Sequence, residues 1–456
     1  MMESTPRPFP QPFVGSWSEA YIKRVAIRLA ILHPRSLHSL PPSRPSLPDM
    51  LFASATAVAL LGVGAAASAA PAKVQLMSRK VASGHMTAIR KRSVMKRGMN
   101  PFSIPLIDQF NGTDLQWYGN ISVGTPPQQI PVVFDTGSYT LEFASTECGE
   151  PCANQVQFDA SASSTFVTTG DVQKIAFETG GGVNPITSPN EYVLWLKPGN
   201  DTVTVNGVAT ANVELNIVVN QTAAFEPDPY SGITGLGPVP EGFFLGLMNN
   251  GLPALFGLYV TPDSVGNAEI TFGGVDESHI HGEIQTASLP SDNDDTWLLS
   301  SSAIYINEQT TSLLSSTRNI IFDSGTSNAY FDPEIAQAIY SSISPNIQPY
   351  PAETTDYGTA YGIPCSEIDG LASELTLTFT NTAGKPFNLT IPSSELNVGP
   401  FPGQTETCQT FINSIQGLNL VGGSLLKHYY AIFSVQNQTI GFADNGVSST
   451  VGNSTA

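Results

Sequence analysis

Two short motifs of the same form carry the candidate catalytic residues. They are Asp135-Thr136-Gly137-Ser138 and Asp323-Ser324-Gly325-Thr326. Two carboxyl groups brought into contact cannot both ionise cheaply, so they share one proton and their pKa values separate. One carboxylate then accepts a proton from water while the other group donates a proton to a substrate carbonyl. This general acid–base chemistry is suited to amide hydrolysis and needs neither a metal nor a cofactor.

The residues around each aspartate predict how the two carboxyl groups are held. Gly137 and Gly325 allow the backbone to bend and approach closely. The hydroxyl groups of the neighbouring residues can orient the carboxylates through hydrogen bonds; these residues are Thr136, Ser138, Ser324 and Thr326. One such motif alone is most often an ordinary turn, whereas two copies favour a paired site.

The elements that position the aspartates are also duplicated. Each aspartate follows an apolar run typical of a buried strand, 132–134 in one case and 320–322 in the other. A second apolar run then ends in glycine, at Gly235 and at Gly422, 100 and 99 residues after the respective aspartate. The repetition predicts two similar lobes related by a pseudo-twofold axis, with Asp135 and Asp323 facing each other.

The remaining pattern indicates strands and few helices. Alternation predicts four further strands, over Val203–Val208, Glu214–Val219, Glu269–Gly273 and Glu374–Phe379. One helix is predicted over Pro333–Ser342, with Asp332 as its N-cap and proline at the first helical position.

The charge of the chain argues against a nucleic-acid partner and favours a protein that works in an acidic medium. The 456 residues include 19 Lys and Arg and 38 Asp and Glu, a net charge of −19, which argues against a nucleic-acid partner. Residues 98–456 alone carry 5 basic and 35 acidic residues. The carboxylates of so acidic a body repel one another at neutral pH, and protonation in acid relieves this repulsion. The alternative reading is an acidic surface kept for solubility.

The basic N-terminal part reads as a secretory precursor. Residues 1–49 are an upstream extension that is disordered or not translated, 50–70 resemble a signal peptide, and 71–97 form a basic propeptide ending in dibasic pairs. The propeptide is predicted to lie on the acidic body as its own inhibitor until cleavage. Seven sequons support secretion and a glycoprotein. The alternatives are a signal anchor or a vacuolar location.

Four cysteines, Cys148, Cys152, Cys365 and Cys408, suggest two disulfides in an exported chain, with three possible connectivities. We prefer Cys148–Cys152 with Cys365–Cys408, because this pairing never crosses the middle of the chain. No histidine lies at ligand spacing from these cysteines, so no metal site is predicted.

These motifs resemble the pepsin-like aspartic peptidase family, of the secreted fungal type, over roughly residues 117–444. The resemblance implies an all-β fold, a bilobal pepsin-like double β-barrel with pseudo-twofold symmetry and a central cleft. The N-terminal lobe would span 98–285 and the C-terminal lobe 286–456. It also implies that Asp135 and Asp323 are the catalytic pair, that the four cysteines pair as preferred above, and that a monomer binds an extended peptide substrate.

The sequence departs from the family at the flap, the hairpin that covers the cleft. Its best match is the segment 175–180, which includes Phe177, Glu178 and Thr179. Phe177 stands where the family has tyrosine, and Glu142 stands where it has the tryptophan that bonds this tyrosine; Tyr192 is a possible substitute. Tyr230 and Ile233 either line a substrate subsite or belong to the core.

The sequence therefore predicts a secreted acid endopeptidase, made as a zymogen, with an Asp135/Asp323 dyad. A second hypothesis, motivated by the altered flap, is a non-catalytic binding or decoy protein that keeps the cleft. A cell-surface β-rich glycoprotein is a third, which the paired motifs disfavour.

Overall fold

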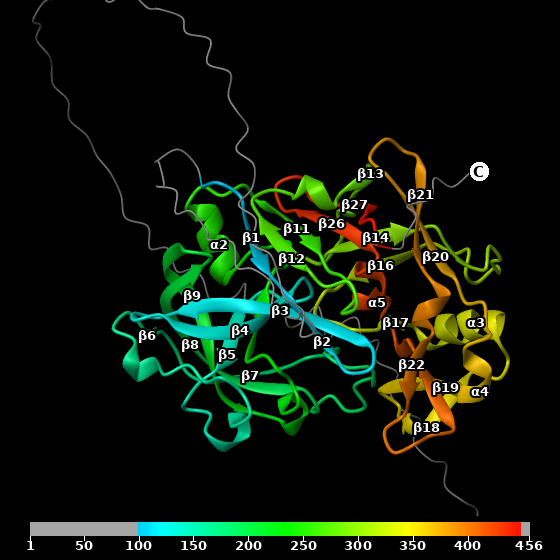
Figure 1. The fold of residues 1–456 in the computed structure, drawn as a ribbon, viewed down its shortest axis with the longest axis horizontal. Coiled ribbons are helices and arrows are strands. Elements are labelled where there is room, and N and C mark those ends of the chain that lie inside the picture. The colour runs from blue at the N-terminus through cyan, green and yellow to red at the C-terminus, as the bar shows by residue number, and fades with distance from the viewer. Residues whose placement is uncertain (1–98, 448–456) are drawn as a thin grey trace, which may run out of the picture. The chain divides into compact units, whose positions relative to one another are not determined.

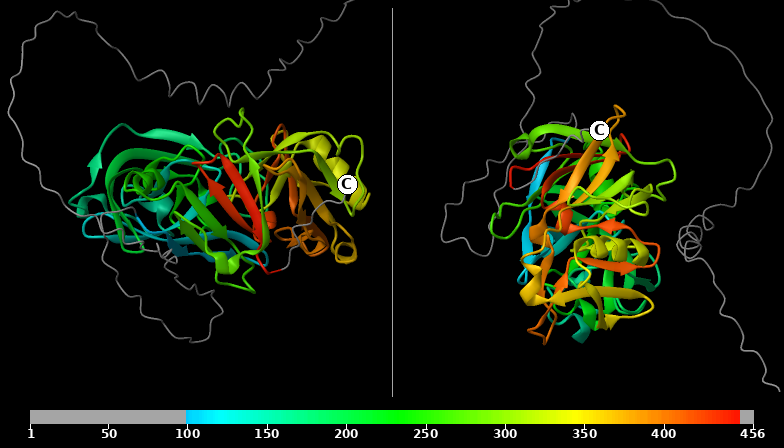
Figure 2. Two further views of the ribbon diagram at one scale, coloured as in Figure 1. Left: turned by 90° about the horizontal axis from the view of Figure 1, so that it is seen from above. Right: turned by 90° about the vertical axis from the view of Figure 1, so that its right-hand side faces the viewer.

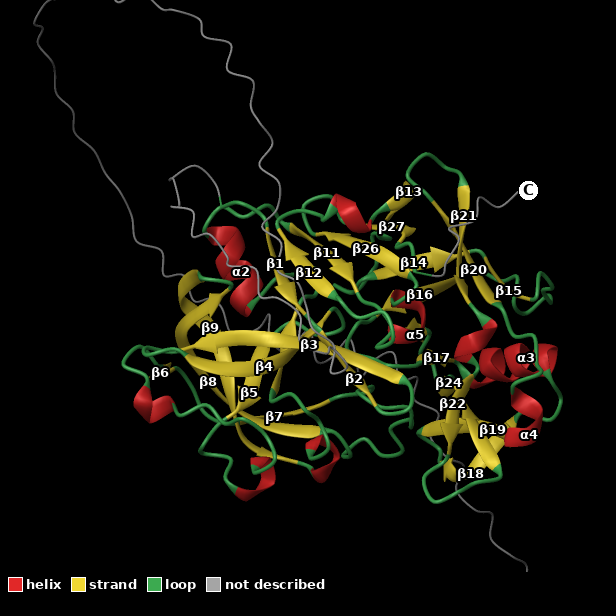
Figure 3. Cartoon of the chain, viewed as in Figure 1, coloured by secondary structure: helices red, strands yellow, loops and turns green. Residues whose placement is uncertain are grey.

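The computed structural model describes residues 99–447, so the predicted upstream extension, signal peptide and propeptide lie outside the described residues. Strands are the main secondary structure of this part of the chain, as Figure 3 shows, and the predicted all-β class is confirmed. Among residues 99–447, no helix combines the length and the apolar character needed to cross a lipid bilayer.

A first nine-stranded sheet, cyan and green in Figure 1, carries the first aspartate motif. Its strands are β2 (Ile107–Phe110), β3 (Asp114–Val123), β4 (Gln128–Asp135), β5 (Leu141–Ala144), β6 (Val167–Thr168), β7 (Gln173–Ala176), β8 (Val193–Val205), β9 (Val208–Gln221) and β10 (Gly232–Gly235). Asp135 is the last residue of β4, which pairs in parallel with β10.

A second nine-stranded sheet carries the other motif. Its strands are β14 (Leu298–Ser301), β16 (Arg318–Phe322), β17 (Ala329–Phe331), β18 (Gln348–Thr354), β19 (Gly358–Pro364), β22 (Asn397–Pro400), β23 (Thr407–Thr410), β24 (Ile412–Ile415) and β25 (Leu420–Val421). Asp323 follows β16 directly.

The two sheets repeat one pairing pattern around the aspartates. In the first sheet β10 is parallel to β4 and antiparallel to β5, and β5 is parallel to β9. In the second sheet β25 is parallel to β16 and antiparallel to β17, and β17 is parallel to β24. The duplication predicted from the two motifs is therefore present in the strand topology.

Two smaller sheets complete the fold. A six-stranded sheet combines strands from the beginning, middle and end of the described chain, and Figure 2 shows its red strands beside green ones. Its members are β1 (Phe102–Pro105), β11 (Leu255–Tyr259), β12 (Glu269–Phe272), β13 (His281–Ser288), β26 (Tyr429–Ser434) and β27 (Thr439–Asp444), and a three-stranded sheet contains β15 (Ala303–Ile306), β20 (Leu375–Thr380) and β21 (Pro386–Ile391). The expected lobe boundary at 285/286 falls within β13 and stays a prediction.

The helices of the described chain are short. They are the α-helices α2 (Gly242–Asn249), α3 (Pro333–Ile343), α4 (Cys365–Ile368) and α5 (Gly423–Leu426), and the 3-10 helices η1 (Glu150–Cys152), η2 (Ala160–Ala162), η3 (Ala223–Phe225), η4 (Glu277–His279) and η5 (Ser393–Glu395). The predicted helix at Pro333 is confirmed, and the Asp332 side chain accepts a hydrogen bond from the Glu334 N–H at its start.

One predicted strand, Val203–Val208, is wrong. The structure has a hairpin here, in which β8 ends at Val205, β9 begins at Val208, and these two residues pair. Asn206 and Gly207 form the two-residue turn with positive φ angles of 47° and 79°. An Asn-Gly pair between apolar alternating residues favours such a turn, and this local signal outweighs the continuous alternation.

Candidate active site

Parallel strand pairs fix the backbone of both aspartates. The Leu236 N–H donates a hydrogen bond of 2.7 Å to the Asp135 carbonyl, and the Asp323 N–H donates one of 3.1 Å to the Val421 carbonyl. Each aspartate is thus held where a buried strand ends beside a second buried strand. Such a position gives a rigid support from which the side chain projects.

The two turns are tied together by a reciprocal exchange of hydrogen bonds. The Thr136 hydroxyl donates to the Phe322 carbonyl (2.8 Å) and accepts from the Ser324 N–H (2.9 Å). The Ser324 hydroxyl donates to the Phe134 carbonyl (2.7 Å) and accepts from the Thr136 N–H (3.0 Å). These two hydroxyls therefore bond backbone groups of the opposite motif rather than the carboxylates, and their support of the dyad is indirect.

The carboxylates receive hydrogen bonds from the other motif residues. The Gly137 N–H donates to Asp135 Oδ1 and the Gly325 N–H to Asp323 Oδ1, both at 2.8 Å. Thr326 Oγ1 donates to Asp323 Oδ2 at 2.6 Å. Ser138 Oγ has no partner within hydrogen-bond geometry, although it lies close enough to Asp135 to lower its pKa. The two halves of the site are therefore not equivalent.

The motif glycines allow the two turns to meet. A Cβ atom added to Gly137 would lie 2.6 Å from Asp323 Cγ, and one added to Gly325 would lie 2.5 Å from Asp135 Cγ. Real Cβ atoms do not approach heavy atoms this closely, so glycine is required at both positions. Each aspartate thus packs directly against the turn of the other motif.

The two aspartates are nearly buried, and their surroundings favour a proton on one of them. Asp135 is 7% exposed and Asp323 is 5% exposed. Burial raises the pKa of Asp135 well above its usual range, and the charge and the hydrogen bond of Asp323 raise it further. One carboxyl group of the pair is therefore protonated under conditions where isolated aspartates are charged, which gives one acid and one base at contact distance.

The structure places Phe177 and Tyr192 beside the first disulfide, but the other predicted flap residues elsewhere. Phe177 and Tyr192 both pack edge-on against Phe225, with ring centroids 6.0 Å and 5.1 Å away. Glu178 is exposed, whereas Thr179 Oγ1 lies 2.8 Å from Thr326 Oγ1. Contact with the support of the dyad therefore comes from Thr179 and not from Phe177.

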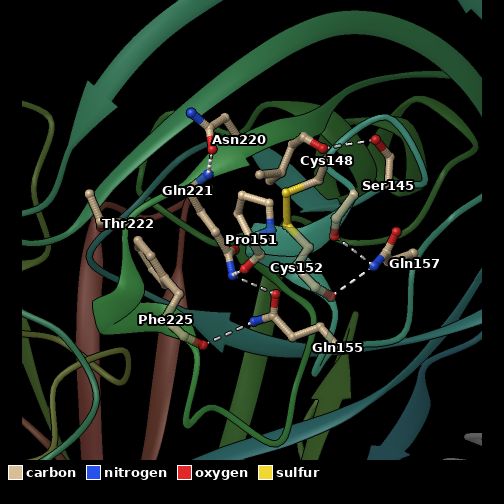
Figure 4. The surroundings of a disulfide bond; sticks show 12 residues. Ser145, Cys148, Pro151, Cys152, Gln155, Gln157, Asn220, Gln221, Thr222 and Phe225 are labelled. Atoms are coloured by element: carbon tan, nitrogen blue, oxygen red, sulfur yellow. Dashed lines mark hydrogen bonds between the residues drawn. A yellow bond between two sulfur atoms is a disulfide. The ribbon is translucent and has the colours of Figure 1, made fainter.

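Disulfides join Cys148 to Cys152 and Cys365 to Cys408, the pairs preferred from the sequence. Figure 4 shows the surroundings of the first, where the Gln157 amide donates to the Cys152 carbonyl at 2.9 Å. The Gln155 amide donates to the Phe225 carbonyl at 3.2 Å. The disulfide loop therefore helps to fix the aromatic residue against which Phe177 and Tyr192 pack.

Tyr230 joins a polar network next to the dyad. Its hydroxyl donates to the Gln116 side-chain carbonyl, and the Gln116 amide donates to the Gly325 carbonyl. Burial raises the pKa of the neighbouring Asp228 to about 7, and its interaction with Tyr230 offsets part of this rise. Tyr230 is thus a buried polar residue connected to the dyad turn.

Glu142 and Ile233 lie on neighbouring strands behind the dyad. Ile233, in β10, is half-buried and pairs with Glu142 of β5. Glu142 is buried and accepts a hydrogen bond of 2.6 Å from the Thr140 hydroxyl. Neither side chain has a described contact with the dyad.

Four polar residues near the dyad were not identified as site residues from the sequence. They are Gln116, Asn328, Gln409 and Asn413, all of them at most 3% exposed. The only sequence feature that could have indicated them is a polar residue within or beside an apolar strand, because buried polar groups require hydrogen-bond partners. Nothing local to any of them indicates which partner it has.

His279 has more acidic neighbours than its sequence surroundings indicate. Ligand atoms of His279, Glu269 and Asp276 lie within 4.8 Å of one another. The His279 ring stacks on Tyr259 with centroids 3.8 Å apart, and Asp276 accepts hydrogen bonds from Ser278. Ordinary stacking and hydrogen bonding account for this group.

The buried carboxyls predict a protein that is most stable in acid. Burial raises the folded-state pKa of Asp228 to about 7. The pKa of Asp108 is also raised, mainly by burial and to a smaller extent by the neighbouring Asp114. The folded state then binds more protons than the unfolded state above pH ~4. The contribution of these two carboxyl groups to the free energy of unfolding is complete below that pH. It is lost as the pH rises to about 7 and beyond. For Asp228 alone the loss is on the order of 4 kcal/mol.

Urea denaturation between pH 4 and 7.5 measures this loss. We expect Asp228→Asn to flatten the profile, whereas replacement of the exposed Asp171 by Asn leaves it unchanged. A wild-type stability that stays constant or increases towards neutral pH would contradict the prediction.

Comparison with known proteins agrees with this geometry. A family model described as eukaryotic aspartyl protease matches residues 116–445. Gastricsin of Mus musculus is 30% identical over 344 residues, 72% of this chain and 81% of that protein. Embryonic pepsinogen of Gallus gallus is 29% identical over 73% of this chain and 81% of that protein, and rhizopuspepsin-4 of Rhizopus niveus is 28% identical over 73% and 78%. The matched region contains both aspartate motifs and most of the described strands, and the chain belongs to the eukaryotic aspartyl protease family, whose pepsin-like members it resembles.

Proposed function

We propose that the protein is an acid aspartic endopeptidase in which Asp135 and Asp323 together activate a water molecule. The observation that carries the proposal is the contact of the two carboxyl groups, each held by the glycine N–H of its own turn. Family membership supports peptide-bond hydrolysis as the reaction. Acidic conditions suit both the shared proton of the dyad and the stability of the buried carboxyls.

The proposal gives each aspartate a separate role. Asp135, whose pKa burial and Asp323 raise, holds the shared proton and donates it to the carbonyl oxygen of the substrate. Asp323, which receives hydrogen bonds from Gly325 and Thr326, accepts a proton from water. The water oxygen then bonds to the carbonyl carbon to give a diol. The proton taken up by Asp323 passes to the amide nitrogen, the C–N bond breaks, and one diol hydroxyl returns its proton to Asp135 as the carboxyl product forms.

The same proposal includes the processing of the precursor. A signal at residues 50–70 and an inhibitory propeptide at 71–97 would deliver an inactive secreted zymogen, and one of the relatives is named a pepsinogen. The acidic body gives the basic propeptide a surface to which it is attracted. Mass spectrometry of the secreted chain tests this part, because a mature N-terminus near residue 98 is expected.

A cleavage assay tests the activity. The full chain, secreted and allowed to process, is incubated with a denatured protein at pH ~3–4, near the carboxylate pKa range. A peptide blocked at both ends is included, because only an endopeptidase cleaves it. We expect internal cleavage in acid and little at neutral pH. Folded, processed protein that binds the blocked peptide without cleaving it would instead support the binding or decoy function.

A further inference from the structure

The segment between β7 and β8 extends from the first sheet to the second and contacts the residues that follow Asp323. We name residues 181–187 the cleft strap. Its Gly182 N–H donates a hydrogen bond of 3.0 Å to Ser327 Oγ, four residues after Asp323. Further along, the Thr355 hydroxyl donates to the Thr187 carbonyl at 3.0 Å. The strap therefore begins on one half of the molecule and is anchored on the other.

A group of three amide side chains binds a single carbonyl of the strap. The Val183 carbonyl oxygen accepts hydrogen bonds from Asn328 Nδ2 and Asn413 Nδ2, both at 2.9 Å, and from Gln409 Nε2. These three side chains are 3%, 0% and 1% exposed. Three buried amide donors thus converge on one backbone carbonyl oxygen, which has only two lone pairs, so two of the donors share one of them.

On its other side the strap is pressed against the network of Tyr230. A Cβ atom added to Gly181 would lie 2.9 Å from Tyr230 Oη and would overlap the Gln116 side-chain oxygen. Gln116 in turn bonds the carbonyl of Gly325 in the dyad turn. With the strap in place, the two catalytic carboxyls retain only 7% and 5% exposure.

These contacts are made by the strap backbone, which is also what an extended peptide presents. The strap bends at Gly182, whose φ is 100°, and this bend presents the Gly182 N–H to Ser327 and the Val183 carbonyl to the three amides, the same kinds of backbone group that a bound peptide offers. We propose that the cleft strap is an intramolecular competitor of the substrate, which occupies backbone-binding groups beside the dyad and must leave before a peptide binds there. This inference rests on the proposed function and names a regulation of the same site.

Release of the strap is compatible with the hairpin that carries it. Ala176 and Val193 pair at the ends of β7 and β8, so the intervening residues can move without breaking the sheet. The population of the released state then sets the apparent affinity for substrate, because only that state binds. Any change that unseats the strap tightens peptide binding without altering the dyad.

Gly181→Ala is the sharpest test. While the strap is seated, the new Cβ would displace Tyr230 Oη and Gln116 Oε1 and disturb the hydrogen bond between them, whereas a released strap carries the methyl group away from both. Gly180→Ala is the matched control, because its Cβ would lie 3.5 Å from the Tyr192 ring, an ordinary contact. A second variant lacks residues 181–189 and joins the hairpin directly, in case the point variant folds poorly.

The measurement is the calorimetric affinity for an extended peptide in which a non-cleavable hydroxyl-bearing group replaces the scissile amide. We expect Gly181→Ala and the shortened variant to bind on the order of tenfold more tightly than the wild type, with Gly180→Ala unchanged. Equal affinity of all four proteins would overturn the strap proposal, even if the wild type cleaves protein. Tighter binding by variants that cleave nothing would support the strap and contradict the proposed endopeptidase.

Discussion

Replacing Asp135 with Asn is expected to lower the rate of peptide cleavage by about 10³-fold or more, and Asp323→Asn should do the same. An amide side chain fills the same space but cannot hold or transfer the shared proton, and acid–base catalysis by one positioned group contributes 10²- to 10⁴-fold. The fold should persist, because neither the Thr136–Ser324 exchange nor the strand pairing involves the carboxyl groups. Single-turnover cleavage of a blocked peptide in acid measures the effect.

Stability gives a second readout of the same variants. Asp135 is buried beside another acid, so an uncharged amide removes a repulsion that grows as the pH rises. Both variants should therefore unfold at urea concentrations equal to or above those of the wild type at neutral pH. The exposed Asp292 provides the control, and its replacement by Asn should change neither rate nor stability. Retention of a tenth of the activity in either dyad variant would refute the assignment.

Lys427→Met is expected to destabilise the protein by about 3–5 kcal/mol. Lys427 is 4% exposed, and its Nζ lies 2.7 Å from Asp114 Oδ2 and 2.8 Å from Glu395 Oε2. Burial alone disfavours its charge, but the two carboxylates outweigh this and raise its pKa. Removing the cation leaves two carboxylates, only 10% and 12% exposed, without their shared partner, although Glu395 keeps His428 Nε2 at 3.1 Å. Urea denaturation at a fixed acidic pH measures the loss.

A surface ion pair supplies the control for this variant. Lys197 bonds Glu147 at 2.9 Å, but the two side chains are 26% and 43% exposed. Solvent screens such a pair, so Lys197→Met should change the unfolding free energy by less than about 1 kcal/mol. Adding Asp114→Asn to Lys427→Met should recover part of the stability. A Lys427→Met protein as stable as the Lys197 variant would show that the buried cluster does not depend on its cation.

Local chemistry made much of the fold accessible from the sequence. The apolar runs before Asp135 and Asp323 predict the strands that end at the dyad, and Asp332 with Pro333 predicts the helix start that α3 shows. The wrong strand prediction over Val203–Val208 also has a local cause, because Asn206 and Gly207 favour a turn although the residues around them alternate as in a strand. Such features depend on residues within a few positions of each other.

The duplicated strand–turn motifs follow from residue types alone, because an aspartate, a small hydroxyl residue and a glycine after a buried strand leave few local conformations. The positions of the flap residues depend instead on packing between distant parts of the chain. Phe177 packs against Phe225, and the Val183 carbonyl meets amides that are 145, 226 and 230 residues away in the chain. Contacts over such separations depend on how whole sheets pack. Every residue type has the same backbone carbonyl, so the residue type does not predict which carbonyl is bound.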